Sequence, residues 1–197
     1  MKYLLAIDQS TSGTKALLFD EAAQLIARSD LPHQQKISEN GWVAHDPTEI
    51  WENTKSVVRM VVEKAGINKG DIVGLGISNQ RETALVWDRE TGLPVYDAIV
   101  WQCARGAKIC EGLSDHAEMI RERTGLRLSP YFSAAKIAWV LQNAPDLAGK
   151  KLCAGTVDSW LVFKMTKGAE FRCDYSNASR TQLFNIRTLS WDPDICA

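Results

Sequence analysis

Two short apolar runs near the start of the chain flank a loop of small and hydroxyl-bearing residues. Residues 3–7 and 15–20 predict two buried strands, and the more polar stretch 23–36 predicts a third strand after them. The loop that joins the first two strands begins at an acid, Asp8, and ends at Lys15. It is longer and more polar than a hairpin turn of about two to five residues requires. The sequence therefore predicts a three-stranded meander whose first connecting loop does more than join two strands.

The apolar spacing then changes to a helical period over residues 46–66. Asp46 predicts the N-cap, Pro47 takes the favoured first helical position, and Gly66 predicts the end of the helix. One face of this helix collects the apolar positions, which are Ile50, Trp51, Thr54, Val57, Val58, Val61 and Val62. Such a stripe predicts a helix that packs on a sheet.

The rest of the chain alternates between strand-like and helix-like stretches. Strands are predicted over 71–78, on both sides of a turn within 83–101, and over 151–156; the first of them is expected to be buried on both faces. Helices are predicted over 104–125 with a break near Gly112, over 133–147 with Ser133 as a cap, and over 157–168. Residues 170–191 predict extended structure with an Asn/Ser-rich turn. This order predicts an α/β protein with a mixed sheet covered by helices.

Composition and charge narrow the classes of partner. A chain of 197 residues fits one domain or a piece of a larger protein, and a net charge of −1 gives no electrostatic case for nucleic acid or an anionic membrane. The apolar runs are far shorter than the about 20 residues of a membrane helix. The five cysteines include no C-x-x-C pair, which favours reduced thiols in a cytosolic protein over a zinc site.

The opening loop, "DQSTSGTK", could hold an anion and a metal ion. Its small residues let backbone N–H groups approach a phosphate closely, and Gly13 is expected to supply a positive φ. Asp8 could hold a metal ion directly or through water, and Lys15 adds a positive charge. The spacing is not that of a Walker A loop. A merely decorated hairpin turn remains the alternative.

Three further stretches place polar or aromatic side chains where buried strands or helices end or begin. In "SNQRET", Arg81 offers a donor fork and Glu82 an acceptor, which together suit vicinal hydroxyl groups. Trp101 could form an apolar wall against the carbon chain of a sugar or polyol, and Tyr131 adds a hydroxyl group ahead of a helix. The alternatives are a solvated turn with an incidental ion pair and a tryptophan of the core.

Seven stretches, spread over nearly the whole chain, together resemble the FGGY family of carbohydrate kinases, most closely its glycerol kinases. They are "DQSTSGTKALLFD", "GWVAHDPTEIW", "ISNQRET", "ETGLPVYDAIVWQ", "TGLRLSPYFSAAKIAWVL", "GTVDSWLVFKMT" and "DYSNASRTQLFNIRTLSWD". The resemblance implies an actin-like, RNase H-like ATPase fold of the α/β class, with a mixed sheet flanked by helices. It also implies ATP and Mg²⁺ as cofactors, and the opening loop as a phosphate-binding turn whose acid helps to place the metal ion.

The family's functional residues carry over to positions that this sequence keeps. Its polyol-binding residues correspond to Arg81, Glu82, Trp101 and Tyr131. Its phosphate-loop residues correspond to Asp8, Gln9, Thr11, Ser12 and Lys15, with Asp8 also at the metal. Two stretches depart from the glycerol kinases: "STSGTK" replaces a Gly-Thr-Thr-like loop followed by Arg, and "CARG" leaves one basic residue where a pair is common. Glycerol, a tetritol and a ketopentose such as xylulose therefore stay open as acceptors.

The resemblance also implies parts of the enzyme that lie outside these residues. Family members are more than twice as long, and their catalytic base, an Asp, is expected beyond residue 197. We therefore expect residues 1–197 to be an incomplete N-terminal kinase domain, without the nucleotide-side domain and inactive alone. The expected partners are ATP and a small sugar or polyol, and the expected location is the cytoplasm. The sequence is compatible with a homo-oligomer. A non-catalytic sugar- or nucleotide-binding relative and an ordinary structural domain are the rival hypotheses.

Overall fold

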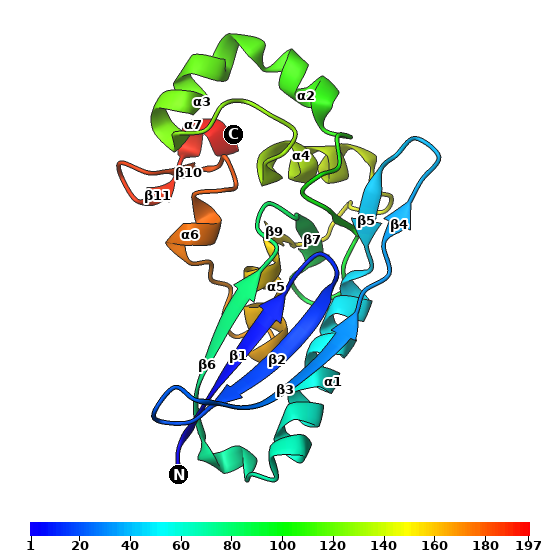
Figure 1. Cartoon of the computed structure of the whole chain (residues 1–197). Coiled ribbons are helices and arrows are strands. Elements are labelled where there is room, and N and C mark those ends of the chain that lie inside the picture. Colours follow the sequence, from blue (N-terminus) through cyan, green and yellow to red (C-terminus); the bar gives the residue numbers. More distant parts are fainter. The chain divides into compact units, whose positions relative to one another are not determined.

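A computed structural model describes residues 1–197, which divide into two compact units (Figure 1). The first unit consists of Met1–Gln35 and His45–Gln80, and the second of Lys36–Ala44 and Arg81–Ala197. Each unit has its own hydrophobic core. None of the helices is both long enough and apolar enough to span a membrane.

The first unit is a four-stranded mixed sheet with one long helix. The strands lie in the order β3-β2-β1-β6. Their bounds are β1 (Tyr3–Gln9), β2 (Gly13–Phe19), β3 (Leu25–Pro32) and β6 (Ile72–Asn79). β1 pairs antiparallel with β2 and parallel with β6. The predicted meander is therefore confirmed, and β6 joins it beside β1.

Helix α1 (Pro47–Ala65) packs on one face of this sheet, against β2 and β3. Asp46 caps its first turn by accepting a hydrogen bond from the Thr48 N–H, and Gly66 ends it in the left-handed conformation. The helix presents its buried stripe to side chains of the strands. The core residues are Leu5, Ala16, Leu18, Ala27, Val57 and Val61. The helix and both of its predicted ends are confirmed; the short 3-10 helix η1 (Lys69–Asp71) then leads into β6.

Strand β6 does not have two buried faces, contrary to the prediction from its apolar run. Val73 is 58% exposed and Leu75 is 47% exposed. The strand lies at the edge of its sheet, α1 packs mainly on β2 and β3, and no residue of β6 is fully buried. An apolar run shows that a strand can be buried, but the number of covering layers is a property of the fold.

The second unit contains three small sheets, six short α-helices and one short 3-10 helix. Its strands pair as β4-β5-β8, β7-β9 and β10-β11, and the last residue of β5 belongs to the first unit. The strand bounds are β4 (Lys36–Ile37), β5 (Val43–His45), β7 (Leu85–Asp88), β8 (Ala98–Ile99), β9 (Leu152–Gly155), β10 (Phe184–Asn185) and β11 (Ser190–Trp191). The helix bounds are α2 (Ala107–Gly112), η2 (Ser114–His116), α3 (Ala117–Thr124), α4 (Ser133–Asn143), α5 (Val157–Met165), α6 (Tyr175–Ala178) and α7 (Pro193–Cys196).

Two predictions for this unit need correction. Ser133 is not the cap of α4: Phe132 takes the N-cap position, and the Ser133 hydroxyl donates to the carbonyl of Glu82 over 3.2 Å. The Asn/Ser-rich turn after residue 170 is the helical turn α6, because the Asp174 side chain caps it by accepting from the Asn177 N–H over 3.0 Å. The predicted helix break near Gly112 is confirmed between α2 and η2.

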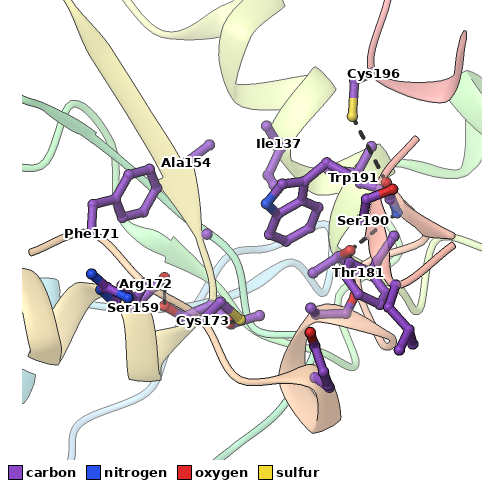
Figure 2. Close-up of a pocket in the computed structure, with 17 residues that line it drawn as sticks. Ile137, Ala154, Ser159, Phe171, Arg172, Cys173, Thr181, Ser190, Trp191 and Cys196 are labelled. Carbon is purple, nitrogen blue, oxygen red and sulfur yellow. Dashed lines mark hydrogen bonds between the residues drawn. The ribbon is translucent and has the colours of Figure 1, made fainter. Parts of the chain in front are cut away.

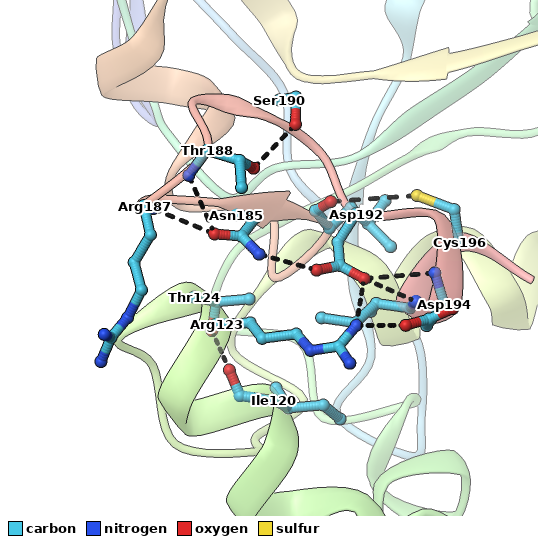
Figure 3. A network of polar contacts seen from close by, with 12 residues as sticks. Ile120, Arg123, Thr124, Asn185, Arg187, Thr188, Ser190, Asp192, Asp194 and Cys196 are labelled. Carbon is cyan, nitrogen blue, oxygen red and sulfur yellow. Dashed lines mark hydrogen bonds and ion pairs between the residues drawn. The ribbon is translucent and has the colours of Figure 1, made fainter.

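Charged side chains tie the last residues of the chain to α3 (Figure 3). Arg123 Nη1 lies 2.8 Å from Asp192 Oδ1 and 2.5 Å from Asp194 Oδ2. Asp192 also accepts from the Asn185 amide at 2.9 Å and caps α7. Because the Asp192 carboxylate is buried, these bonds are needed to offset its desolvation.

Candidate functional site

The opening loop is the tight connection between β1 and β2. Asp8 and Lys15 are directly paired across the two strands, and Lys15 Nζ lies 2.8 Å from Asp8 Oδ2. Both side chains remain partly exposed, at 39% for Asp8 and 29% for Lys15. Ser10 closes the turn, because its N–H and its hydroxyl both donate to the Gly13 carbonyl. The loop thus presents a carboxylate and an ammonium group side by side at its open edge.

Gly13 is required at this loop for a different reason from the predicted one. Its φ is not positive, but a Cβ at this position would lie 2.5 Å from the Leu31 carbonyl oxygen and 3.1 Å from Pro32 Cα. Glycine therefore lets β2 approach β3 closely where the loop ends. The prediction of a positive φ at Gly13 is wrong, whereas the need for glycine is real.

A buried polar layer lies behind the loop. Gln9 is fully buried, and its side chain lies 2.8 Å from His33 Nε2 and accepts from Gln80 over 3.1 Å. Thr14 Oγ1 lies 2.9 Å from the same His33 nitrogen. Burial first, and then the neighbouring His45, lower the pKa of His33 to about 4. His33 is therefore neutral at pH 7, and this layer fixes the shape of the loop without adding charge.

The remaining predicted residues of the loop, Thr11 and Ser12, lie at its tip. Thr11 is half-buried and Ser12 is exposed. The Ser12 hydroxyl lies 3.3 Å from that of Ser10, and the Ser12 carbonyl accepts from the His33 N–H over 3.0 Å. The structure thus brings the five predicted loop residues together in the first unit, with Gln9 inside and the other four at or near the surface.

The second unit contains the other predicted residues, around Glu82. Glu82 is buried, and its φ of 65° is unusual for a residue with a side chain. Its Oε1 accepts from Arg180 Nε over 2.6 Å, and its carbonyl accepts from Ser133. A strained backbone that is held from two sides is typical of a functional position.

Aromatic side chains lie around the Arg180 guanidinium that contacts this carboxylate. Trp101 and Tyr131 meet edge to face, with ring centroids 5.7 Å apart, and Tyr131 meets Phe132 at 5.2 Å. The Arg180 guanidinium lies 5.0 Å from the Phe132 ring centroid and 6.0 Å from that of Tyr131. The backbone N–H of Trp101 donates to the Thr83 hydroxyl over 3.2 Å. We call Glu82, Trp101, Tyr131, Phe132 and Arg180 the Glu82 cluster.

The structure brings three of the four predicted polyol-binding residues into this cluster. Arg81, the fourth, precedes Glu82 in the same turn, and its side chain is exposed. An exposed guanidinium next to a buried carboxylate offers donors and acceptors on one short stretch of chain. The arrangement can bind hydroxyl groups against an aromatic wall.

Sequence reasoning missed Arg180 and Lys136. Arg180 lies in "SNASRT", and nothing in its local pattern connects it with a glutamate far earlier in the chain. Lys136 could have been found, because residues 133, 136, 137 and 140 follow the spacing of the buried face of a helix, and all four are buried. A lysine in such a stripe indicates a buried polar contact.

A cavity of about 600 Å³ in the second unit is lined by residues other than those of the Glu82 cluster (Figure 2). Apolar side chains dominate its wall, among them Ile137, Phe171 and Trp191. Cys173 also lines it, but burial raises the pKa of this thiol, which therefore stays protonated and weakly nucleophilic. None of the residues predicted from the sequence lies in this wall.

The fold is the actin-like α/β fold that solved sugar-kinase structures share. Residues 3–197 match the sequence family described as the N-terminal domain of the FGGY family of carbohydrate kinases. The chain belongs to this family.

Its relatives include glycerol kinases from several bacteria. The chain is 50% identical to the glycerol kinase of Parabacteroides distasonis over 200 residues, which cover 98% of the chain and 40% of that protein. It is 49% identical to glycerol kinase 1 of Thermotoga maritima over 199 residues, again 98% of the chain and 40% of the relative. The chain thus spans about 40% of the length of these curated relatives.

Solved structures agree with this assignment. The crystal structure of Plasmodium falciparum glycerol kinase with ADP superimposes with a TM-score of 0.89 at 38% identity, over 100% of this chain and 40% of that one. A ligand-bound xylulose kinase from Lactobacillus acidophilus superimposes with a TM-score of 0.87 at 20% identity, over 99% of this chain and 39% of that one. At that identity the second comparison supports the fold alone.

Proposed function

We propose that this chain is the acceptor-binding, N-terminal part of an ATP-dependent polyol kinase, with glycerol as the first candidate acceptor. The Glu82 cluster is the observation that carries the proposal: a buried carboxylate is held by Arg180, whose guanidinium lies 6.0 Å from the Tyr131 ring centroid, and Tyr131 meets Trp101. The similarity to glycerol kinases at about half identity supports glycerol over other polyols.

In this proposal the second unit orients the acceptor. Glu82 accepts hydrogen bonds from vicinal hydroxyl groups, because the contact of Oε1 with Arg180 leaves acceptor capacity on the carboxylate. Arg81 donates to the same hydroxyl groups, and Trp101 covers the carbon chain. Holding the acceptor in one orientation removes much of the entropic barrier to transfer.

In the reaction, the terminal hydroxyl oxygen of the acceptor attacks the γ-phosphorus of ATP. The bond from that phosphorus to the β–γ bridging oxygen breaks, and ADP leaves with the electron pair. The hydroxyl proton passes to an Asp that we place beyond residue 197, as a general base does in kinases. In this proposal residues 1–197 supply no general base, and the nucleotide-side domain lies outside them.

The opening loop would hold the phosphates, with Asp8, Thr11, Ser12 and Lys15 at its open edge and Gln9 supporting it from within. Asp8 fits a magnesium site, since Mg²⁺ commonly takes one or two carboxylates and completes its shell with water and phosphate oxygens. When bound, Mg²⁺ would neutralise charge on the phosphates. Lys15 already pairs with Asp8 and is placed to contact a phosphate when that pair opens. We place the reaction in the cytoplasm.

The test uses the full-length protein that contains this chain, with ATP, Mg²⁺ and one acceptor at a time. ADP formation is measured with glycerol, erythritol and D-xylulose. Glycerol should give the highest kcat/KM. A preference for xylulose would retain the kinase and change the acceptor class, whereas no turnover with any of the three would contradict the proposed function.

A second measurement concerns residues 1–197 alone. Without an opposing wall, phosphates bound at the loop would stay in water, where charge contacts are screened. This part should therefore bind ATP weakly and form no ADP with glycerol. Steady, glycerol-dependent ADP formation that copurifies with residues 1–197 would require a base within them.

A further inference from the structure

Lys136 is buried inside the second unit, although an ammonium group is costly to remove from water. Its relative exposure is 0%. Its Nζ donates to the carbonyl of Pro130 over 2.7 Å, to that of Phe132 over 3.1 Å, and also to that of Tyr131. One side chain of α4 thus satisfies three successive carbonyls of the segment that precedes this helix.

Lys136 has enough N–H donors for all three carbonyls only when its amino group is charged. An ammonium group has three N–H donors, which equals the number of carbonyls that it contacts. A neutral amine has two donors and would leave one carbonyl without a partner. Because an unsatisfied buried polar group is costly, the segment would rearrange.

The segment held in this way contributes two rings to the Glu82 cluster. Tyr131 meets Trp101, and Arg180 lies over Tyr131 and Phe132. The N–H of Tyr131 donates to the Ser129 hydroxyl over 3.2 Å, so the backbone is also closed on itself. The position of both rings therefore depends on the backbone that Lys136 binds.

We propose that Lys136 is a positioning residue for the acceptor: its ammonium group fixes the backbone of residues 130–132 and thereby the Tyr131 ring against Trp101. This inference rests on the proposed function and extends it, because Lys136 itself does not touch the acceptor. It acts through three carbonyls.

The hydrogen bonds from Lys136 to the three carbonyls should depend on pH, because they need the charged form of its amino group. Burial lowers the pKa of Lys136 to about 7, while nearby Cys103, Glu82 and Cys110 favour the charged form. These groups come from the loop after β8, from the turn before β7 and from α2. Two of them are themselves in contact with an arginine, since Arg105 donates to Cys103 and Arg180 to Glu82. Loss of the Lys136 proton should loosen the segment and weaken acceptor binding as the pH rises through about 7.

The first experiment compares Lys136→Met with Lys164→Met in the full-length protein. Met keeps the length and the apolar stem of lysine without its donors. Lys164 is a matched control, because it also donates to a carbonyl in this unit, that of Gly92, but outside the Glu82 cluster. The glycerol KM should rise about tenfold or more in Lys136→Met, with the ATP KM unchanged. A rise no larger than that of Lys164→Met would overturn the inference.

The second experiment uses the unaltered protein. Its glycerol KM, divided by its ATP KM, should increase between about pH 6 and about pH 9, and Lys136→Met should lose this increase. A ratio that stays constant over that range would overturn the inference.

The third experiment needs no turnover and separates this inference from the proposed function. Amide hydrogen exchange at Tyr131 and Phe132 should accelerate about tenfold or more in Lys136→Met and not in Lys164→Met. Unchanged exchange overturns the inference even in an active kinase. Accelerated exchange in a protein that phosphorylates no polyol supports the positioning of the segment and contradicts the proposed function alone.

Discussion

Arg180 Nε donates to Glu82 Oε1 across 2.6 Å, although 98 positions separate the two residues in the sequence. The Glu82 carboxylate is 6% exposed and Arg180 is 29% exposed, so the pair joins a buried acid to a half-buried base. Burying a carboxylate without such a partner would be costly. Arg180 therefore offsets the cost of burying Glu82 and fixes its side chain in one orientation.

Arg180→Lys should raise the acceptor KM about tenfold to a hundredfold, because a lysine lacks the planar fork that contacts both Glu82 and the aromatic rings. Steady-state kinetics with glycerol measures this change in KM. Arg187→Lys is the control, since Arg187 is exposed in the same C-terminal region and its side chain points outward (Figure 3). Equal effects of the two substitutions would remove Arg180 from the acceptor site.

Arg81→Ala should lower kcat/KM for the acceptor by about a hundredfold or more, the scale of a lost charged hydrogen bond in a transition state. The free energy of unfolding should stay nearly constant, because the Arg81 side chain is exposed. Kinetics and denaturant unfolding of the same preparation measure the two effects. Unchanged kinetics with glycerol and with related polyols would show that Arg81 does not bind the acceptor.

Asp8→Asn should lower turnover at least about tenfold and raise the Mg²⁺ concentration that turnover requires, because the amide keeps the shape but loses the charge. Stability should change by less than about 1 kcal/mol, since the pair with Lys15 is partly exposed. Asp30→Asn is the control, as Asp30 pairs with Arg28 at the surface of β3. Full activity of Asp8→Asn at limiting Mg²⁺ would mean that the loop is only a turn.

His33 should make the first unit less stable in acid. Its pKa falls from the usual 6.5 to about 4 in the folded chain, so below pH 6.5 the unfolded chain binds a proton that the folded chain does not. The stability contributed by neutral His33 is complete above pH 6.5 and is lost as the pH falls toward 4. His45 adds to it, because burial lowers its pKa too.

Urea unfolding between about pH 7 and about pH 4.5 measures this loss. His33→Gln should flatten the acid limb of the profile, whereas His116→Gln, at an exposed histidine of the second unit, should leave it unchanged. Parallel profiles for His33→Gln and the unaltered protein would show that His33 titrates normally.

Gly13→Ala should destabilise the first unit by about 1–3 kcal/mol, because the new Cβ would lie 2.5 Å from the Leu31 carbonyl oxygen. Gly76→Ala is the matched control in the same sheet, since nothing lies within 4 Å of a Cβ there. Thermal unfolding of both variants measures the difference. If Gly13→Ala were as stable as the control, β2 and β3 would have to separate at little cost at this point.

The sequence by itself determined the features that depend on a few neighbouring residues. Asp46 and Gly66 bound α1 because a capping side chain and a left-handed residue act on their own helix ends. The hairpin loop, its acid and the exposed Arg81 could likewise be identified, since each depends on a few neighbouring residues. The family resemblance added roles for Glu82, Trp101 and Tyr131 that local patterns left open.

Only the tertiary structure decided the contacts between distant segments. It left much of β6 exposed, because this strand lies at the edge of the sheet and α1 packs mainly on β2 and β3. It replaced the predicted cap at Ser133 by a bond to Glu82, and brought Arg180 to the same residue. It also turned Lys136 from a lysine in a helical stripe into the donor to three carbonyls. Such pairings depend on how separate elements pack, and no local pattern of side chains records which of them will meet.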